Sequence, residues 1–160
     1  MKPLKLIRSM QGKQTPSDGG YQDRLESYGI YQAARQLFEL FWDDSEIIGA
    51  DYRGRELVKQ QIRSLDSICS NIEEGYGRGF GKELPQHLKI ARGEVRESKG
   101  RFERCKRLLH SDTVAARTAS LDRIIGGLTK SINTIENRRA IPPPRSDSRH
   151  PSPATRHSQP

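Results

Sequence analysis

The stretch SNIEEGYGRGFGKEL, residues 70–84, holds the residues of this sequence whose types and spacing come closest to those of a binding site. Four glycines alternate there with Tyr76, Arg78 and Phe80. Aromatic rings can stack on nucleobases while an arginine meets a phosphate, so this pattern is compatible with nucleic-acid binding. A phosphate-binding loop would need the spacing GxxxxGK[ST] between a strand and a helix. Because this segment has neither the spacing nor the strand, a nucleotide cradle is disfavoured.

The same glycines also suit a hinge between two helices. The helical pattern stops after Glu74, and Gly75 stands where a left-handed glycine commonly ends a helix. Pro85 falls in the first turn of the next helix, where its missing N–H costs little. A purely structural hinge and a hinge that also binds nucleic acid both remain open. The candidate hinge residues are Asn71, Glu74, Gly75, Tyr76 and Gly77.

Basic side chains concentrate in residues 82–107, which hold nine basic and four acidic residues, whereas residues 21–46 hold two basic and six acidic ones. Several of the basic residues follow an apolar position by one step, which predicts a row along one edge of a buried stripe. Such a row could track phosphates. Alternatively, it could pair with acidic groups such as Glu39 or Asp43, in the same or a neighbouring subunit. The candidate nucleic-acid-binding residues are Arg78, Lys89, Arg92, Arg96, Lys99, Arg101, Arg104 and Lys106.

Catalytic and metal-binding patterns are poor in this sequence. Di-iron sites in helix bundles use Glu-x-x-His pairs on two helices, whereas Glu83 and His87 are four residues apart and have no counterpart. We expect His87 to be a surface or helix-end residue. Cys69 and Cys105 occupy apolar positions without CxxC spacing, which predicts buried reduced thiols. We therefore expect no metal, no cofactor and no enzymatic activity.

Four amphipathic helices are predicted to position these residues, at about 25–43, 51–74, 84–109 and 113–138. The third has the clearest apolar seam, and its members recur at alternating steps of four and three. They are Leu84, Leu88, Ala91, Val95, Ser98, Phe102, Cys105 and Leu109. This rhythm is typical of helices packed at shallow angles, and the connections are short. The sequence thus predicts an all-α, up-down-up-down four-helix bundle over residues 23–140, with a long open coiled coil as the alternative.

The two ends of the chain have no core-forming pattern. Residues 1–22 are basic and rich in turn formers, and residues 141–160 contain six prolines, so both are predicted to be disordered tails. The net charge of +8 lies largely in these ends and favours polyanionic partners, although solubility alone accounts for a modest excess. No apolar run approaches membrane-spanning length and the start lacks a signal-peptide pattern, which predicts a cytoplasmic protein without membrane contact.

The segment SICSNIEEGYGR, followed by GKEL and HLKIARGEV, resembles a bacterial four-helix-bundle family over about residues 28–135. That family includes proteins encoded in intervening sequences of large-subunit ribosomal RNA genes and accessory variability proteins of diversity-generating retroelements. The resemblance implies a ring-shaped homopentamer with a basic surface. For the retroelement branch, it implies binding to RNA or DNA and to a reverse transcriptase. It also gives Asn71 and Glu74 a role, which is to hold Arg78 or the hinge backbone.

Two functions follow as expectations. The first is a non-enzymatic, oligomeric nucleic-acid-binding accessory protein that assists a reverse transcriptase. The second is a structural interaction module, encoded in a ribosomal RNA intervening sequence, whose basic helix serves assembly.

Overall fold

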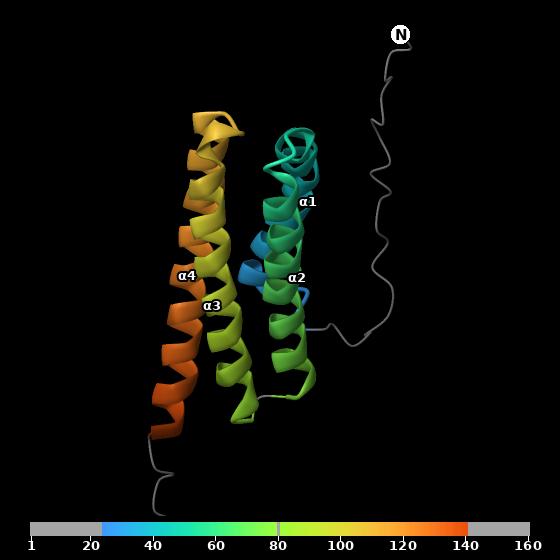
Figure 1. Cartoon of the computed structure of the whole chain (residues 1–160). Coiled ribbons are helices and arrows are strands. Elements are labelled where there is room, and N and C mark those ends of the chain that lie inside the picture. Colours follow the sequence, from blue (N-terminus) through green and yellow to red (C-terminus); the bar gives the residue numbers. More distant parts are fainter. Residues whose placement is uncertain (1–23, 80, 141–160) are drawn as a thin grey trace, which may run out of the picture.

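The computed structural model describes residues 24–79 and 81–140 and folds them into a helical bundle (Figure 1). Its elements are α1 (Gly29–Ala50), α2 (Arg55–Gly77), α3 (Glu83–Arg104), the short 3-10 helix η1 (Cys105–Arg107) and α4 (Ser111–Ala140). The connection from α2 to α3 lies at one end of the bundle, and the other two connections lie at the opposite end. The predicted all-α four-helix bundle is confirmed. The predicted tails, 1–22 and 141–160, lie outside the described residues.

The core is built around α3, which packs most extensively against α2 and α4. All eight residues of the seam predicted in this region are buried. The Phe41 ring of α1 meets the Phe102 ring of α3 edge to face, with their centroids 5.8 Å apart. Burying a side chain of this size contributes roughly 1.5–3 kcal/mol, so these apolar stripes supply the main driving force for assembling the bundle.

The first helix differs from the prediction at both ends, since α1 begins at Gly29 instead of about residue 25 and continues past Asp43 to Ala50. Asp44 lies on the buried face of α1, where a carboxylate would be costly without a partner. Arg117 of α4 supplies that partner with two hydrogen bonds, from Nε to Oδ2 at 2.7 Å and from Nη2 to Oδ1 at 3.2 Å. This pair allows the helix to continue where the apolar pattern is interrupted.

The prediction that Gly75 ends the second helix in a left-handed conformation is wrong. The helix α2 continues to Gly77, and Gly75 is a buried helical residue. The left-handed conformation belongs to Gly79, whose φ is +83°. The third helix is also shorter than predicted: its α-helical part ends at Arg104, and η1 follows.

Candidate nucleic-acid interface

Arg78, expected to meet a phosphate, is held by two carboxylates at the end of α2. Its Nη2 lies 2.5 Å from Oε1 of Glu74, one turn earlier, and its Nη1 lies 3.7 Å from Oε1 of Glu83. The hydrogen bond to Glu74 raises the pKa of Arg78 above its usual value. The prediction that Glu74 holds Arg78 is confirmed. A phosphate would therefore have to compete with two carboxylates for the Arg78 guanidinium.

Asn71 and Gly75 connect α2 to α3 rather than to the glycine loop. The Asn71 side-chain amide donates to the Ser67 carbonyl at 2.8 Å, and its oxygen lies 3.5 Å from Nδ1 of His87. His87, expected at the surface or a helix end, is instead inserted between the helices with only 15% of its side chain exposed. A Cβ atom at Gly75 would lie 3.0 Å from both His87 Cβ and Leu84 Cδ1. Gly75 therefore permits the close approach of α3 to α2.

Two lysines of α3 are bonded to α4. Lys89 Nζ lies 2.6 Å from a carboxylate oxygen of Glu136, and Lys99 Nζ lies 2.7 and 2.9 Å from the two oxygens of Asp122. The hydrogen bond to Asp122 raises the pKa of Lys99. The intramolecular acidic partners of these lysines thus come from α4, and not from the acidic helix α1 that the charge pattern suggested.

Two arginines of α3 are directed toward neighbouring helices. Arg92 donates from Nη1 to the Thr129 hydroxyl at 3.1 Å, and its Nε atom is buried without a hydrogen-bond partner in the described part of the chain. Arg101 donates to the Ser64 hydroxyl of α2 and, at 2.8 Å, to Glu97. Both side chains therefore contribute to helix packing before any ligand is considered.

Arg96, Arg104 and Lys106 are exposed and make none of the contacts to neighbouring helices described for these four. Within residues 24–79 and 81–140, none of the three makes an ion pair. Arg107 of η1 is exposed beside them and was not among the predicted residues. These cations lie toward the end of α3 that is far from Arg78, so the eight predicted residues do not form one continuous surface.

A comparison with protein families matches residues 26–132 to the 23S rRNA-intervening sequence protein family. The chain belongs to this family. The match spans most of the four-helix bundle and agrees with the resemblance carried by the segment SICSNIEEGYGR. A search of curated proteins finds no match to the chain.

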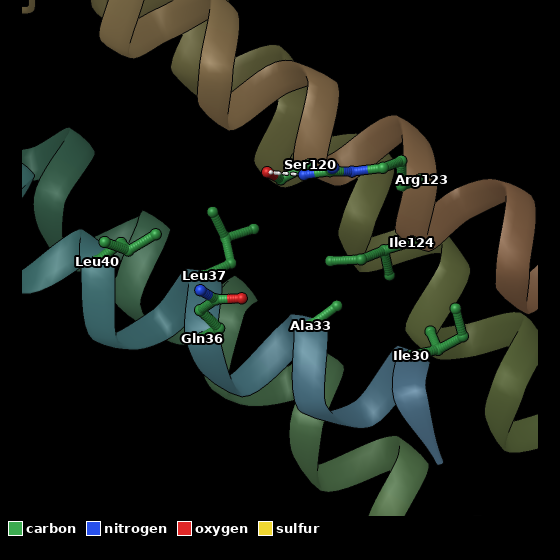
Figure 2. Close-up of a pocket in the computed structure, with 8 residues that line it drawn as sticks. All are labelled: Ile30, Ala33, Gln36, Leu37, Leu40, Ser120, Arg123 and Ile124. Carbon is green, nitrogen blue, oxygen red and sulfur yellow. Dashed lines mark hydrogen bonds between the residues drawn. The ribbon is translucent and has the colours of Figure 1, made fainter.

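The bundle of this family member has a groove between α1 and α4, which pack together less closely than α3 and α4 do. Figure 2 shows Leu37 and Ile124 directed into the groove, and Leu40 on the α1 side. Its volume is about 480 Å³, and Arg123 on the opposite wall donates to the Ser120 hydroxyl at 2.9 Å. Leu40 and Ile47, two turns apart on α1, are 37% and 57% exposed. This side of α1 therefore presents apolar surface.

A second cavity of about 310 Å³, here called the hinge pocket, lies where the end of α2 meets the start of α3 and the last turns of α4. Its apolar residues are Leu84, Leu88 and Ile135, and its other lining residues include Tyr76, Lys130 and Arg138. The glycine pattern pointed to Tyr76. It gave no signal for Lys130 and Arg138, which belong to another helix more than fifty residues later.

Cys69 and Cys105 are buried free thiols, so their predicted burial is confirmed. Burial raises the pKa of Cys69 to about 11 and also raises that of Cys105, which keeps both thiols neutral at physiological pH. No group of three or more potential metal ligands occurs among the described residues. None of the helices that the structure describes is long and apolar enough to cross a membrane.

Proposed function

We propose that this member of the 23S rRNA-intervening sequence protein family is a non-enzymatic accessory protein that binds nucleic acid. The supporting observation is the group of exposed basic side chains that have no carboxylate partner among the described residues, represented by Arg96, Arg104 and Lys106. A cation that has no intramolecular partner gains an interaction when it meets a phosphate. A paired lysine, such as Lys99, must first give up its carboxylate.

The binding we propose is directed at the phosphate backbone of RNA or DNA. Contacts to phosphates release condensed counterions and carry no sequence information directly. The exposed cations are separated along α3 and η1, as is suitable for following a backbone. Affinity should therefore depend strongly on salt and weakly on sequence.

We also propose that the working state is a homo-oligomer, for which the resemblance implies a pentameric ring. The exposed residue Leu40 lines the α1–α4 groove and Ile47 lies two turns further along α1, and burying both against a second copy would remove them from water. The acidic character of α1 and the basic character of α3 add charge complementarity between copies. A reverse transcriptase is the enzyme partner that the retroelement branch of the resemblance implies.

A second candidate function is a structural interaction module without a nucleic-acid role. The observation that favours it is the pairing of Lys89 with Glu136 and of Lys99 with Asp122, which uses part of the basic row to hold α3 against α4. In that case the remaining cations would serve assembly between copies.

The test compares a variant of the exposed cations, Arg96→Gln with Lys106→Gln, with a control variant of the paired ones, Lys89→Gln with Lys99→Gln. Glutamine is a comparable helix former, so both variants should keep the fold. Binding to a fluorescein-labelled single-stranded RNA is measured by anisotropy from low to moderate salt. The mass of the oligomer in solution is measured by light scattering.

We expect the exposed-cation variant to flatten the slope of log affinity against log salt by about 1.4, because each neutralised phosphate of a single strand accounts for about 0.7 of that slope. The control should change the slope by less than half as much. Absence of RNA binding by the unaltered protein at low salt would refute the proposed function. A lower oligomer mass with an unchanged slope of log affinity against log salt would support the structural module instead.

A further inference from the structure

We propose that the hinge pocket binds one unstacked base of a single-stranded nucleic acid, and that Lys130 and Arg138 hold the phosphates on either side of it. This inference rests on the proposed function, because it names the part of the nucleic acid that the protein recognises. It assigns the aromatic role to Tyr76 and moves the phosphate contacts from Arg78 to α4.

The shape and lining of the hinge pocket suit a flat, largely apolar group. Leu84 and Leu88 are 2% and 1% exposed, so the inner wall is a fixed part of the core. The volume of about 310 Å³ lies at the lower limit of ligand pockets, which leaves room for one base. An apolar interior favours the face of a base that has left its stack.

Tyr76 provides a ring that is already held in place. It packs against the ring of Tyr28, with centroids 5.3 Å apart, and the Tyr28 hydroxyl lies 2.8 Å from the Ser131 hydroxyl on α4. A positioned aromatic side chain contributes about 5- to 150-fold in affinity per stacked base.

Two positively charged side chains beside the pocket favour a nucleic acid over an uncharged occupant. Lys130 and Arg138 are exposed, and in the described part of the chain no carboxylate lies within ion-pair distance of either one. They are eight residues apart on one helix, a rise of about 12 Å, so they can flank a base on its two sides. Glu136, the acidic residue between them in sequence, is bonded to Lys89.

Two other cavities among the described residues lack this combination of features. In the groove between α2 and α3, Arg63 and Arg101 share the lining with Glu94 and Glu97, so the local charge is balanced. In the α1–α4 groove, Arg123 is the one charged side chain among the described residues of the lining. The hinge pocket therefore combines an apolar wall, an aromatic ring and two cations without a carboxylate partner in the part of the chain that the structure describes.

The test uses the full chain and two single-stranded RNA probes of equal length, one of uridines and one with alternate positions abasic. Thr134→Trp places a large ring in the pocket from an exposed position on α4, and Thr134→Gln is the matched control. We expect the unaltered protein and the control to bind the uridine probe about tenfold more tightly than the abasic probe. Thr134→Trp should reduce this preference to less than twofold and leave affinity for the abasic probe unchanged.

A second variant, Lys130→Gln with Arg138→Gln, tests the phosphate contacts. It should weaken binding of both probes and flatten their salt slopes by about 1.4. As a measurement that does not depend on a substitution, a 4-thiouridine probe should crosslink under near-ultraviolet light to the peptide that contains Tyr76.

Equal affinity of the unaltered protein for the two probes would overturn the base pocket and leave the proposed function intact. Failure to bind either probe would instead refute the proposed function. If Thr134→Trp lowers the mass of the oligomer, a second copy occupies the pocket and the proposal is wrong. If the two probes differ in affinity only after residues 1–22 or 141–160 are deleted, the chain's own ends occupy the pocket, and the proposal is also wrong. Crosslinks confined to peptides far from the pocket would also refute it.

Discussion

Three glycines spaced two residues apart should respond differently to alanine, although the sequence makes them look alike. Gly75 is buried in α2 against α3, Gly77 is the last residue of α2, and Gly79 has a positive φ. We expect Gly77→Ala to stabilise the protein, and both Gly75→Ala and Gly79→Ala to destabilise it. The ordering follows from the space and backbone conformation at each position.

The magnitudes can be worked out from the surroundings of each Cβ position. At Gly77 no atom of the described residues lies within 4 Å of the added Cβ, so alanine should gain up to about 1 kcal/mol through its higher helix propensity. At Gly75 the same gain is opposed by contacts of 3.0 Å to Leu84 Cδ1 and His87 Cβ, and overpacking costs roughly 1–3 kcal/mol. At Gly79 there is space, but a left-handed conformation costs an L-residue about 1–2 kcal/mol.

The assay is urea unfolding followed by far-ultraviolet circular dichroism, at one protein concentration, because an oligomer's stability depends on concentration. Gly75→Ala should be less stable than Gly77→Ala by about 1–3 kcal/mol. Combining Gly75→Ala with Leu84→Ala removes one of the two close approaches, so the double variant should be destabilised by less than the sum of the two single effects. If Gly75→Ala is at least as stable as Gly77→Ala, the explanation based on close helix approach is wrong.

Three further predictions concern buried and paired groups. Asp44→Ala should lower the unfolding free energy by about 3–5 kcal/mol, because it leaves the Arg117 guanidinium largely buried without its partner, and adding Arg117→Ala should recover part of that stability in urea unfolding. By contrast, Lys99→Gln should change the unfolding free energy far less in the same assay, because Asp122 is half exposed and the pair is accessible to solvent. The raised pKa of Cys69 means that the folded protein keeps a proton that the unfolded chain loses above its usual pKa of 9.0. Stability should therefore be unaffected by this thiol below about pH 9 and should fall as the pH rises to about 11, a decline that Cys69→Ala would lessen and that urea unfolding across this range would measure.

Periodicity along the chain determined the helices and much of the core. The eight-residue seam of α3 was read from alternating steps of four and three, and every member is buried. This succeeds because the side chains that share one face of a helix are set by its own 3.6-residue repeat. The same reasoning missed the end of α1, since a buried aspartate interrupts the pattern in the same way as a helix end does. Its partner Arg117 is 73 residues away.

Tertiary structure decided which polar residues are available for binding. Arg78 and Lys99 look equivalent to Arg96 in the sequence. The first two are bonded to carboxylates, whereas Arg96 makes no ion pair within residues 24–79 and 81–140. The grouping of Tyr76 with Lys130 and Arg138 likewise depends on how α4 packs against the end of α2. Periodicity specifies a face of one helix, but it does not specify which residue of another helix lies opposite. Because a charged side chain acts through its nearest partner, the candidate interface could be located only after the helices were packed together.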